Sequence, residues 1–200
     1  MATQTSVVTP ERYETGFSSF AEWQEKIENR QEEFQKHYDE YQPNAEDIAA
    51  IKKLVQERGI KAMVIGENWC PDVWRGLPVV SKMQEATDMT VRYFFRDQNK
   101  DIMAEFLNKG EFESIPTVVF YDGEHNYIGH WIERPVSAIE DMARLRKEIL
   151  EPAPSEDGPE RQAAQAKYRE ATAAKAGDWR HATLKEFREL IEAAPKKAFP

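Results

Sequence analysis

Four short runs of apolar residues, separated by segments with helical patterns, constrain the fold more than any other feature of this sequence. The runs cover residues 61–66, 90–95, 117–121 and 127–132. Each is too short for a helix and reads as a buried strand. Helical patterns at residues 75–86 and 97–108 connect the first three runs, and Asp122-Gly123 forms a hairpin-type turn before the last. A strand–helix–strand unit gives a parallel pair with a right-handed crossover, and a hairpin adds antiparallel strands. The sequence therefore predicts an α/β fold with a mixed central sheet flanked by helices.

Helical patterns also precede this region. Large apolar residues recur there at spacings of three, four and seven, so they fall on one face of a helix that begins near Ser18 or Ser19 and ends before Pro43. These residues are Phe20, Trp23, Ile27, Phe34, Tyr38 and Tyr41. We interpret this face as part of the core rather than as a ligand site. A second helix is expected over residues 44–59, with Gly59 as its stop.

Further helices are expected after the last strand. A long helix should start at Pro135, with Ile139, Met142, Leu145 and Ile149 on its inner face. Residues 151–159 are rich in proline and acidic residues and read as a linker. The helix that follows has Tyr168 as its only large apolar residue and can bury little, whereas a last helix over residues 183–194 should pack on the domain or on a partner.

These patterns divide the chain into five segments. They are a disordered N-terminus (1–16), an N-terminal helical extension (17–59), a central domain (60–150), a linker (151–159) and a C-terminal helical tail (160–200). We expect disorder at the start because that segment is polar. The helical extensions offer surfaces through which a homo-oligomer could form.

Charge and composition exclude several kinds of partner. The net charge is −9 and no segment contains a run of Lys or Arg, which argues against nucleic acid. A membrane span needs about 20 apolar residues in a row, which the chain lacks, and its start lacks the pattern of a secretory signal. The single cysteine cannot form an internal disulfide, and none of the four histidines has the spacing of a zinc motif. We expect a soluble, cytoplasmic protein without a metal.

Cys70, the only cysteine, follows the first predicted strand and stands where a helix begins. The first N–H groups of that helix and its dipole favour the thiolate, which is the nucleophilic form. Pro71 suits the first helical turn, where its missing N–H is not needed. Asp72 acts in the opposite direction, since a carboxylate close to the sulfur disfavours the thiolate. The sequence leaves open which effect is larger, but this context makes Cys70 a candidate for chemistry.

Several features around Cys70 match one family in their order and spacing. Trp69-Cys70 follows a buried strand, Pro78 lies eight residues after the cysteine, Ile115-Pro116 opens a strand, and Asp122-Gly123 marks a late hairpin. Together they resemble the thioredoxin-fold family, with its Trp-Cys-x-x-Cys motif, its proline in the active-site helix and its cis-proline loop. The resemblance covers residues 60–150. More narrowly, the sequence is similar to a bacterial group of thioredoxin-like proteins with Trp-Cys-Pro-Asp sites.

The resemblance implies a role for the residues of this site. Cys70 would be the attacking thiol. Pro116 would be cis and lie against the sulfur, and the main chain of Ile115 would pair with a bound substrate. The other substrate-binding residues would be Trp69, Pro71 and Asp72. Because only about one X-Pro bond in twenty is cis in folded proteins, the expectation at Ile115-Pro116 is specific.

The sequence departs from the family at two positions. Val73 stands where the family has a second cysteine, which releases the substrate from its mixed disulfide with the first. Val64 stands where many thioredoxins bury an acid, and Glu67 is the nearest upstream carboxylate. Both departures argue against an ordinary thioredoxin reductant.

Two main hypotheses follow for function. In the first, the chain is a monothiol oxidoreductase. Cys70 attacks a protein disulfide or a sulfenic acid, or accepts a small thiol such as glutathione, and an external thiol resolves the adduct. No cofactor is expected apart from a low-molecular-weight thiol as co-substrate. In the second, the chain is a non-catalytic thioredoxin-fold module. The groove between the Cys70 helix and the Pro116 loop binds an extended peptide, and the helical ends form an oligomer or partner surface. A cluster carrier of the monothiol glutaredoxin kind is a weaker third alternative, since the sequence shows no recognisable small-thiol pocket.

Overall fold

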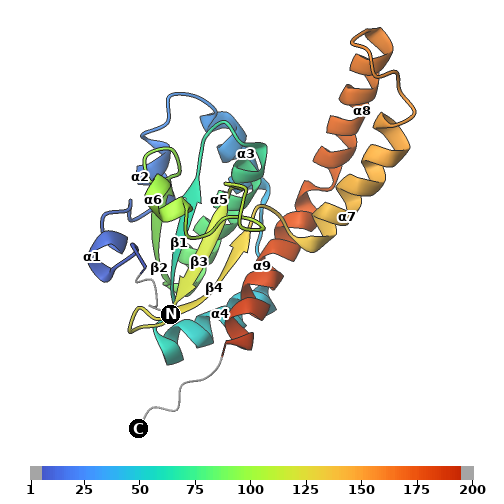
Figure 1. The fold of residues 1–200 in the computed structure, drawn as a ribbon. Coiled ribbons are helices and arrows are strands. Elements are labelled where there is room, and N and C mark those ends of the chain that lie inside the picture. Colours follow the sequence, from blue (N-terminus) through green and yellow to red (C-terminus); the bar gives the residue numbers. More distant parts are fainter. Residues whose placement is uncertain (1–5, 195–200) are drawn as a thin grey trace.

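The computed structural model describes residues 6–194, and a four-stranded sheet forms its centre (Figure 1). The strands are β1 Lys61–Gly66, β2 Thr90–Phe95, β3 Thr117–Tyr121 and β4 Tyr127–Ile132. Their order in the sheet is β2-β1-β3-β4. β1 pairs in parallel with β2, and the β1–β3 and β3–β4 pairs are antiparallel. The predicted strands and the mixed sheet are therefore confirmed.

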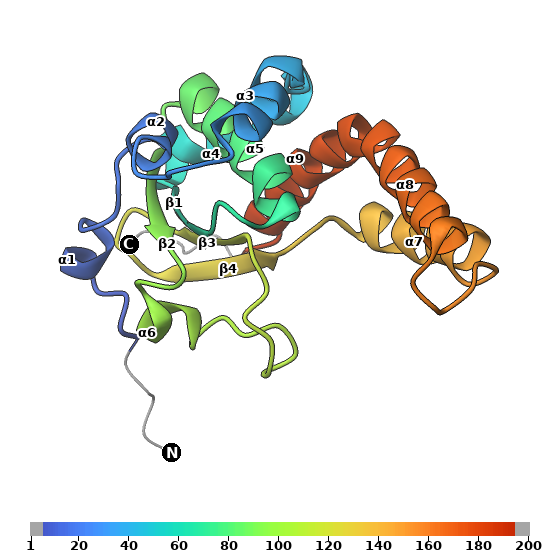
Figure 2. The same cartoon turned by 90° about the horizontal axis from the view of Figure 1, so that it is seen from above.

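Helices cover both faces of this sheet. α4 (Ala45–Arg58), α5 (Pro71–Thr87) and α9 (Ala176–Ala193) lie on one face, and the short α6 (Lys100–Met103) lies on the other (Figure 2). α3 (Gln31–Glu40) packs on the outside of α5. Every residue of β3 is buried, which agrees with a strand covered on both faces.

The N-terminal aromatic residues contribute to the core, as expected, but they come from two helices. α2 (Phe20–Gln24) is capped by Ser19, whose Oγ accepts the N–H of Glu22. α3 begins only after Arg30, whose φ of 73° is left-handed. A right-handed helix does not continue through such a residue, so the prediction of one helix up to Pro43 is wrong. α4 is capped by Asn44 and ends at the left-handed Gly59, which confirms the second predicted helix.

The expectation of disorder over residues 1–16 is wrong for residues 6–16, and residues 1–5 lie outside the described residues. This segment contains α1 (Pro10–Tyr13), capped by Thr9. Tyr13 is fully buried, and its hydroxyl lies 3.0 Å from the carbonyl oxygen of Ala62 and 3.1 Å from that of Thr90. Tyr13 therefore holds the segment against the start of β1 and β2, and the buried Val8 adds a second contact, neither of which a polar composition reveals.

The helix expected over residues 97–108 is mostly a loop. Only α6 is helical, and it buries Ile102 and Met103. Lys109 and Gly110 both have left-handed backbone conformations, and Asn108 pairs with Phe112 in an isolated bridge. The helix ends at Met103, well before the predicted residue 108, and the two left-handed residues turn the chain back on itself further on.

The long helix predicted after β4 is present, but it packs against α8 (Pro159–Ala174) and α9. α7 (Val136–Leu145) continues as a π-helical turn over Arg146–Leu150 and forms a projecting arm with α8 (Figure 1). Of the four residues expected on its inner face only Leu145 is buried, and Ile139 is 55% exposed. Throughout α8, all of which is described, no residue is buried, in agreement with its polar pattern.

α9 covers the sheet in place of α7. It begins at Ala176, before the predicted residue 183, and buries Trp179, Leu184, Phe187 and Ile191. The Phe187 ring packs edge-on against Phe120 of β3 and Trp131 of β4. The expectation that the last helix packs on the domain is confirmed, and residues 195–200 of the predicted tail lie outside the described residues.

Glu186 of α9 fixes the junction between β4 and α7. Its carboxylate accepts the indole N–H of Trp131 at 2.7 Å and the main-chain N–H of Val136 at 2.8 Å. One side chain therefore joins the end of the sheet, the start of the arm and the helix that covers the sheet.

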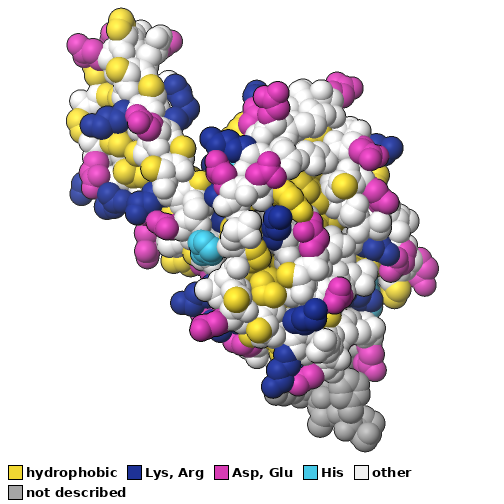
Figure 3. Space-filling model, turned by 180° about the vertical axis from the view of Figure 1, so that it is seen from behind, with side chains coloured by type: hydrophobic (Ala, Val, Ile, Leu, Met, Phe, Trp, Pro, Cys, Tyr) yellow, Lys and Arg dark blue, Asp and Glu magenta, His cyan; other side chains and the backbone are white. Residues whose placement is uncertain are grey.

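The surface shows no large region of one charge on the face drawn in Figure 3. Lys and Arg side chains are interspersed there with Asp and Glu side chains, and hydrophobic side chains gather near the centre. Within residues 6–194, no helix combines the length and the apolar character that crossing a bilayer requires.

Candidate functional site

Cys70 occupies the N-cap position of α5, shortly after the end of β1 and directly before Pro71. The Cys70 carbonyl accepts the N–H of Val73 at 3.0 Å and that of Trp74 at 3.2 Å, which starts the helix. The Cys70 side chain is partly buried. As predicted from the order of elements, the sulfur lies where the helix begins, next to its free N–H groups.

The loop before β3 lies against this sulfur. The Ile115-Pro116 peptide bond is cis, as the resemblance implied. Cys70 Sγ lies 3.7 Å from the carbonyl oxygen of Ile115. A Cβ atom placed on Gly76 of α5 would be 2.7 Å from Cγ of Pro116, so the absence of a side chain at Gly76 allows helix and loop to meet. α5 and the Pro116 loop together form the two sides of the candidate site.

The pKa of the Cys70 thiol is raised above its ordinary value. Burial is the largest cause, and the negative charge of Asp72 acts in the same direction. The main-chain N–H groups of Val73 and Asp72 and the charge of Arg75 lower the pKa, but less than burial raises it. The sequence left open whether the start of the helix or Asp72 has the larger effect on the thiol. Desolvation exceeds the effect of the helix N–H groups, so the thiol is mainly protonated near neutral pH.

Val73 and Val64 occupy the positions at which the sequence departs from the family pattern. Val73 is fully buried, and a Cβ on Gly66 would come within 2.8 Å of its Cγ1. Val64 is buried in β1. Glu67 is also buried and accepts the main-chain N–H of Asp97 at 2.8 Å, and burial raises the pKa of its carboxyl. Glu67 therefore ties the loop before Cys70 to the end of β2.

Trp69 lies on the solvent side of the site and is 51% exposed. The guanidinium of Arg96 lies over its ring, 4.9 Å from a ring centroid, and Arg96 Nη1 donates to the carbonyl oxygen of Glu113 at 3.4 Å. Arg96 thus contacts both the loop before Cys70 and the loop before Pro116. Arg96 was not predictable from the sequence, because nothing in its local pattern separates it from other surface arginines.

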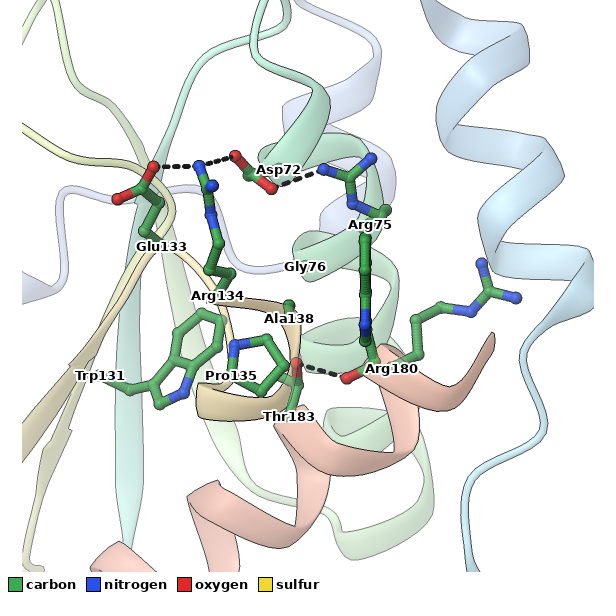
Figure 4. A pocket seen from close by; sticks show the side chains of 11 residues that line it. Asp72, Arg75, Gly76, Trp131, Glu133, Arg134, Pro135, Ala138, Arg180 and Thr183 are labelled. Atoms are coloured by element: carbon green, nitrogen blue, oxygen red, sulfur yellow. Dashed lines mark hydrogen bonds and ion pairs between the residues drawn. The ribbon is translucent and has the colours of Figure 1, made fainter. Parts of the chain in front are cut away.

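Asp72 points away from solvent and is held by two arginines (Figure 4). Its carboxylate lies 2.5 Å from Nη2 of Arg75 and 2.6 Å from Nη2 of Arg134, and Arg134 also pairs with Glu133. The Asp72 side chain is only 12% exposed. Pairing with two cations offsets the cost of burying this carboxylate. Asp72 is thus a structural neighbour of Cys70 rather than an exposed contact for a substrate, whereas Pro71 is exposed.

The remaining partners of this ion-pair network come from the C-terminal helices. The guanidinium of Arg75 lies over the ring of Trp179, 5.7 Å from a ring centroid. These residues surround a cavity of about 20 Å³ between α5, the β4–α7 junction and α9 (Figure 4). The spacing of Asp72 and Arg75 on a helix could have revealed their pair. Trp179 lies far from Cys70 in the sequence, so no local signal could have found it.

His130 and His37 lie in separate environments. His130 Nδ1 is 2.5 Å from the hydroxyl of Tyr127, and its ring packs against Phe106. His37 Nδ1 is 2.6 Å from Nη1 of Arg180. Within residues 6–194, no group of three or more His, Cys, Asp or Glu side chains is arranged to hold a metal ion.

Comparison with known proteins gives the following findings. A family model described as Thioredoxin matches residues 17–148. A crystal structure of a protein of unknown function from Pseudomonas aeruginosa is 21% identical with a TM-score of 0.62, covering 94% of this chain and 98% of that one. An HIV epitope scaffold is 20% identical with a TM-score of 0.62, covering 96% and 100%. At these identities the two structures support the fold alone. No curated protein matches the sequence.

Proposed function

The chain belongs to the thioredoxin family, and we propose that it carries out thiol–disulfide exchange through the single thiol of Cys70. The observation that carries this proposal is the position of the sulfur, 3.7 Å from the carbonyl oxygen of Ile115 and beside the cis Pro116. A disulfide that approaches this sulfur meets the Pro116 loop on one side and the start of α5 on the other. The narrower likeness to a bacterial group with Trp-Cys-Pro-Asp sites is part of the same proposal.

The proposed reaction has two steps. The Cys70 thiolate attacks one sulfur of a disulfide R–S–S–R′, a bond forms between Cys70 and R–S, and R′–S⁻ leaves and takes up a proton. An external thiolate R″–S⁻ then attacks the R sulfur, forms R–S–S–R″ and returns the electron pair to Cys70. Because Val73 supplies no second thiol, this outside thiol is required. A protein disulfide fits the role of R–S–S–R′, and a low-molecular-weight thiol of the cytoplasm fits the role of R″–SH.

The raised pKa of Cys70 makes both steps of the proposed exchange slow near neutral pH. Few molecules carry a thiolate near neutral pH, so the attack is slow there and becomes faster as the pH rises. A thiolate of high pKa is also a poor leaving group, so the mixed disulfide is released slowly when an external thiol attacks the sulfur of R. We therefore propose a protein that holds a thiol partner for longer than a dithiol thioredoxin would.

A second candidate is a non-catalytic module that binds an extended peptide between α5 and the Pro116 loop. The partial burial of Cys70 and its raised pKa favour this candidate, because both reduce the reactivity of the sulfur. Trp69 would then serve as an exposed aromatic contact for the peptide.

Reaction of the native chain with glutathione disulfide separates the two candidates. We expect one glutathione to attach to Cys70, detected by intact-protein mass, at a rate that rises with pH through and above the ordinary cysteine range. Excess reduced thiol should remove the adduct. Cys70→Ser provides the blank. If the native thiol stays unmodified and reacts only in denaturant, the exchange proposal is wrong and the binding module remains.

A further inference from the structure

The C-terminal helix α9 reaches the active-site helix at one buried aromatic residue. Trp179 is 3% exposed and lies at the start of α9. Its indole N–H donates to Oδ2 of Asp141 in α7 at 3.1 Å, which fixes the orientation of the ring. The guanidinium of Arg75 on α5 lies over this ring, 5.7 Å from a ring centroid. A cation over an indole ring is attracted to it, and more strongly when water is excluded.

Arg75 also forms an ion pair with Asp72, which lies two residues after Cys70. Its Nη2 lies 2.5 Å from Asp72, and both side chains are largely buried. Asp72 also holds Arg134 from the β4–α7 junction. The pair is shielded from solvent. A change in the position of Arg75 therefore changes the electrostatic potential at Cys70 more than it would at an exposed site.

The charged groups around Cys70 come from several elements. They are Asp72 and Arg75 on α5, Glu133 and Arg134 at the β4–α7 junction, Glu67 before α5, and Arg96 and Asp97 after β2. Around Arg75 itself lie Arg180 on α9, which lines the same cavity, and His37 on α3, while Asp141 on α7 holds Trp179. Of the groups around Cys70, Arg75 is the one whose cationic group contacts α9. The cavity beside it, at about 20 Å³, has room for about one water molecule, so a role in binding a substrate does not fit.

We propose that Trp179 is a positioning residue for Cys70: it holds Arg75 against Asp72, and α9 thereby sets the charge beside the thiol. This inference deepens the proposed function and rests on Cys70 being its reacting group. The direction of the effect follows from the signs of the charges. Arg75 lowers the pKa of Cys70 and Asp72 raises it. When Trp179 no longer holds Arg75, the lowering effect weakens and Asp72 is less neutralised, so both changes disfavour the thiolate.

Alkylation of the full chain by iodoacetamide across a pH series tests this inference. Trp179→Leu keeps an apolar side chain but removes the aromatic face, whereas Trp179→Phe keeps a face for Arg75. We expect Trp179→Leu to lower the alkylation rate at pH 7.5 roughly threefold and to shift the rate profile to higher pH, because the rate follows the thiolate fraction. Trp179→Phe keeps a ring but loses the hydrogen bond to Asp141, so it should shift the profile less than Trp179→Leu does. Arg75→Gln should slow the reaction as Trp179→Leu does.

A double-mutant cycle separates this role from a general structural one. In the Arg75→Gln background, Trp179→Leu should cause no further change, since the residue through which it acts is already neutral. Ile191→Ala is the matched control: it weakens α9 packing at the other end of the helix, and it should leave the profile unchanged. An unchanged profile for Trp179→Leu, a further effect in the Arg75→Gln background, or an equal shift in Ile191→Ala would each overturn the inference.

The same data distinguish this inference from the proposed function. Iodoacetamide reports the state of the thiol directly and needs no disulfide substrate. A chain whose alkylation responds to Trp179→Leu but which forms no adduct with glutathione disulfide would retain the inference and lose the exchange proposal. The reverse result would retain exchange and overturn the role of Trp179.

Discussion

At the scale of single residues, Val73 determines what can happen to an adduct at Cys70. Its position is buried, and its N–H donates to the carbonyl of Cys70 in the first turn of α5. Val73→Cys should therefore place a second thiol one helical turn from the first, at a cost in stability of about 1 kcal/mol for the lost packing. We expect this variant to release a bound thiol partner without any external thiol, because the introduced thiol can form a disulfide with Cys70.

The measurement is intact-protein mass after transfer of the glutathione adduct into thiol-free buffer. Val73→Ser, which has a side chain of similar size to cysteine but no sulfur, is the control and should keep the adduct. An adduct that persists equally in Val73→Cys would show that the two side chains cannot meet in the folded chain.

Gly76 is the residue on which the contact between α5 and the Pro116 loop depends. Replacing glycine by alanine inside a helix usually stabilises it by up to about 1 kcal/mol. At Gly76, however, the new Cβ would lie 2.7 Å from Cγ of Pro116, so helix and loop must separate. We expect Gly76→Ala to reduce the free energy of unfolding by about 2 kcal/mol in urea titrations and to alter the alkylation rate of Cys70.

Gly177 in α9 provides the comparison for this substitution. A Cβ at Gly177 has no neighbour within 4 Å, so Gly177→Ala should leave the stability unchanged or increase it. If the two variants behave alike, the close contact at Pro116 is not what requires glycine at position 76.

At the scale of elements, α3 and α9 are joined by a pair that responds to acid. Nη1 of the buried Arg180 contacts Nδ1 of His37. Burial, together with the charge of Arg180, lowers the pKa of His37 to about 4. The unfolded chain, with an ordinary pKa of about 6.5, binds the proton first, so this contribution to stability is complete above pH 6.5 and is lost as the pH falls toward 4.

We expect this loss to be on the order of 2 kcal/mol, reduced by the partial exposure of the ring. Urea unfolding at pH 7.5 and pH 4.5 measures it. His37→Gln keeps an acceptor for Arg180 but cannot take up the proton, so it should lose less stability between the two pH values. An equal loss in both proteins would assign the effect to carboxylates elsewhere.

The elements also show what local patterns can predict. The strands were predictable because each is a short apolar run, and α4 because Asn44 and Gly59 mark its ends. Cys70 and Pro116 were predictable because each belongs to a local motif. That α9 rather than α7 covers the sheet was not predictable, because both helices are amphipathic and the contacts of α9 join distant residues. Phe187 packs on Phe120 and Trp131, and Glu186 bonds groups about fifty residues away. Arg96 and Trp179 were missed because their contacts, too, are with residues distant in the sequence.

At the scale of the whole molecule, stability is distributed unevenly between the domain and the α7–α8 arm. Phe187 of α9 is fully buried against Phe120 and Trp131, whereas Tyr168 of α8 is partly exposed on the arm. We expect Phe187→Ala to lower the free energy of unfolding by about 3–5 kcal/mol. Tyr168→Ala should change it by about 0.5 kcal/mol or less. Thermal and urea unfolding of the two variants measure the difference, and equal losses would mean that the arm contributes to the core.

The late position of α9 in the chain has a consequence for biosynthesis. Proteins emerge from the ribosome N-terminal end first, so all four strands are made before α9 exists. Until α9 emerges, Phe120 and Trp131 lack the cover that Phe187 provides on their side of the sheet. We therefore expect chaperones that bind exposed aromatic residues to associate with nascent chains stalled before α9. These chaperones should dissociate once α9 has been made and has packed on the sheet.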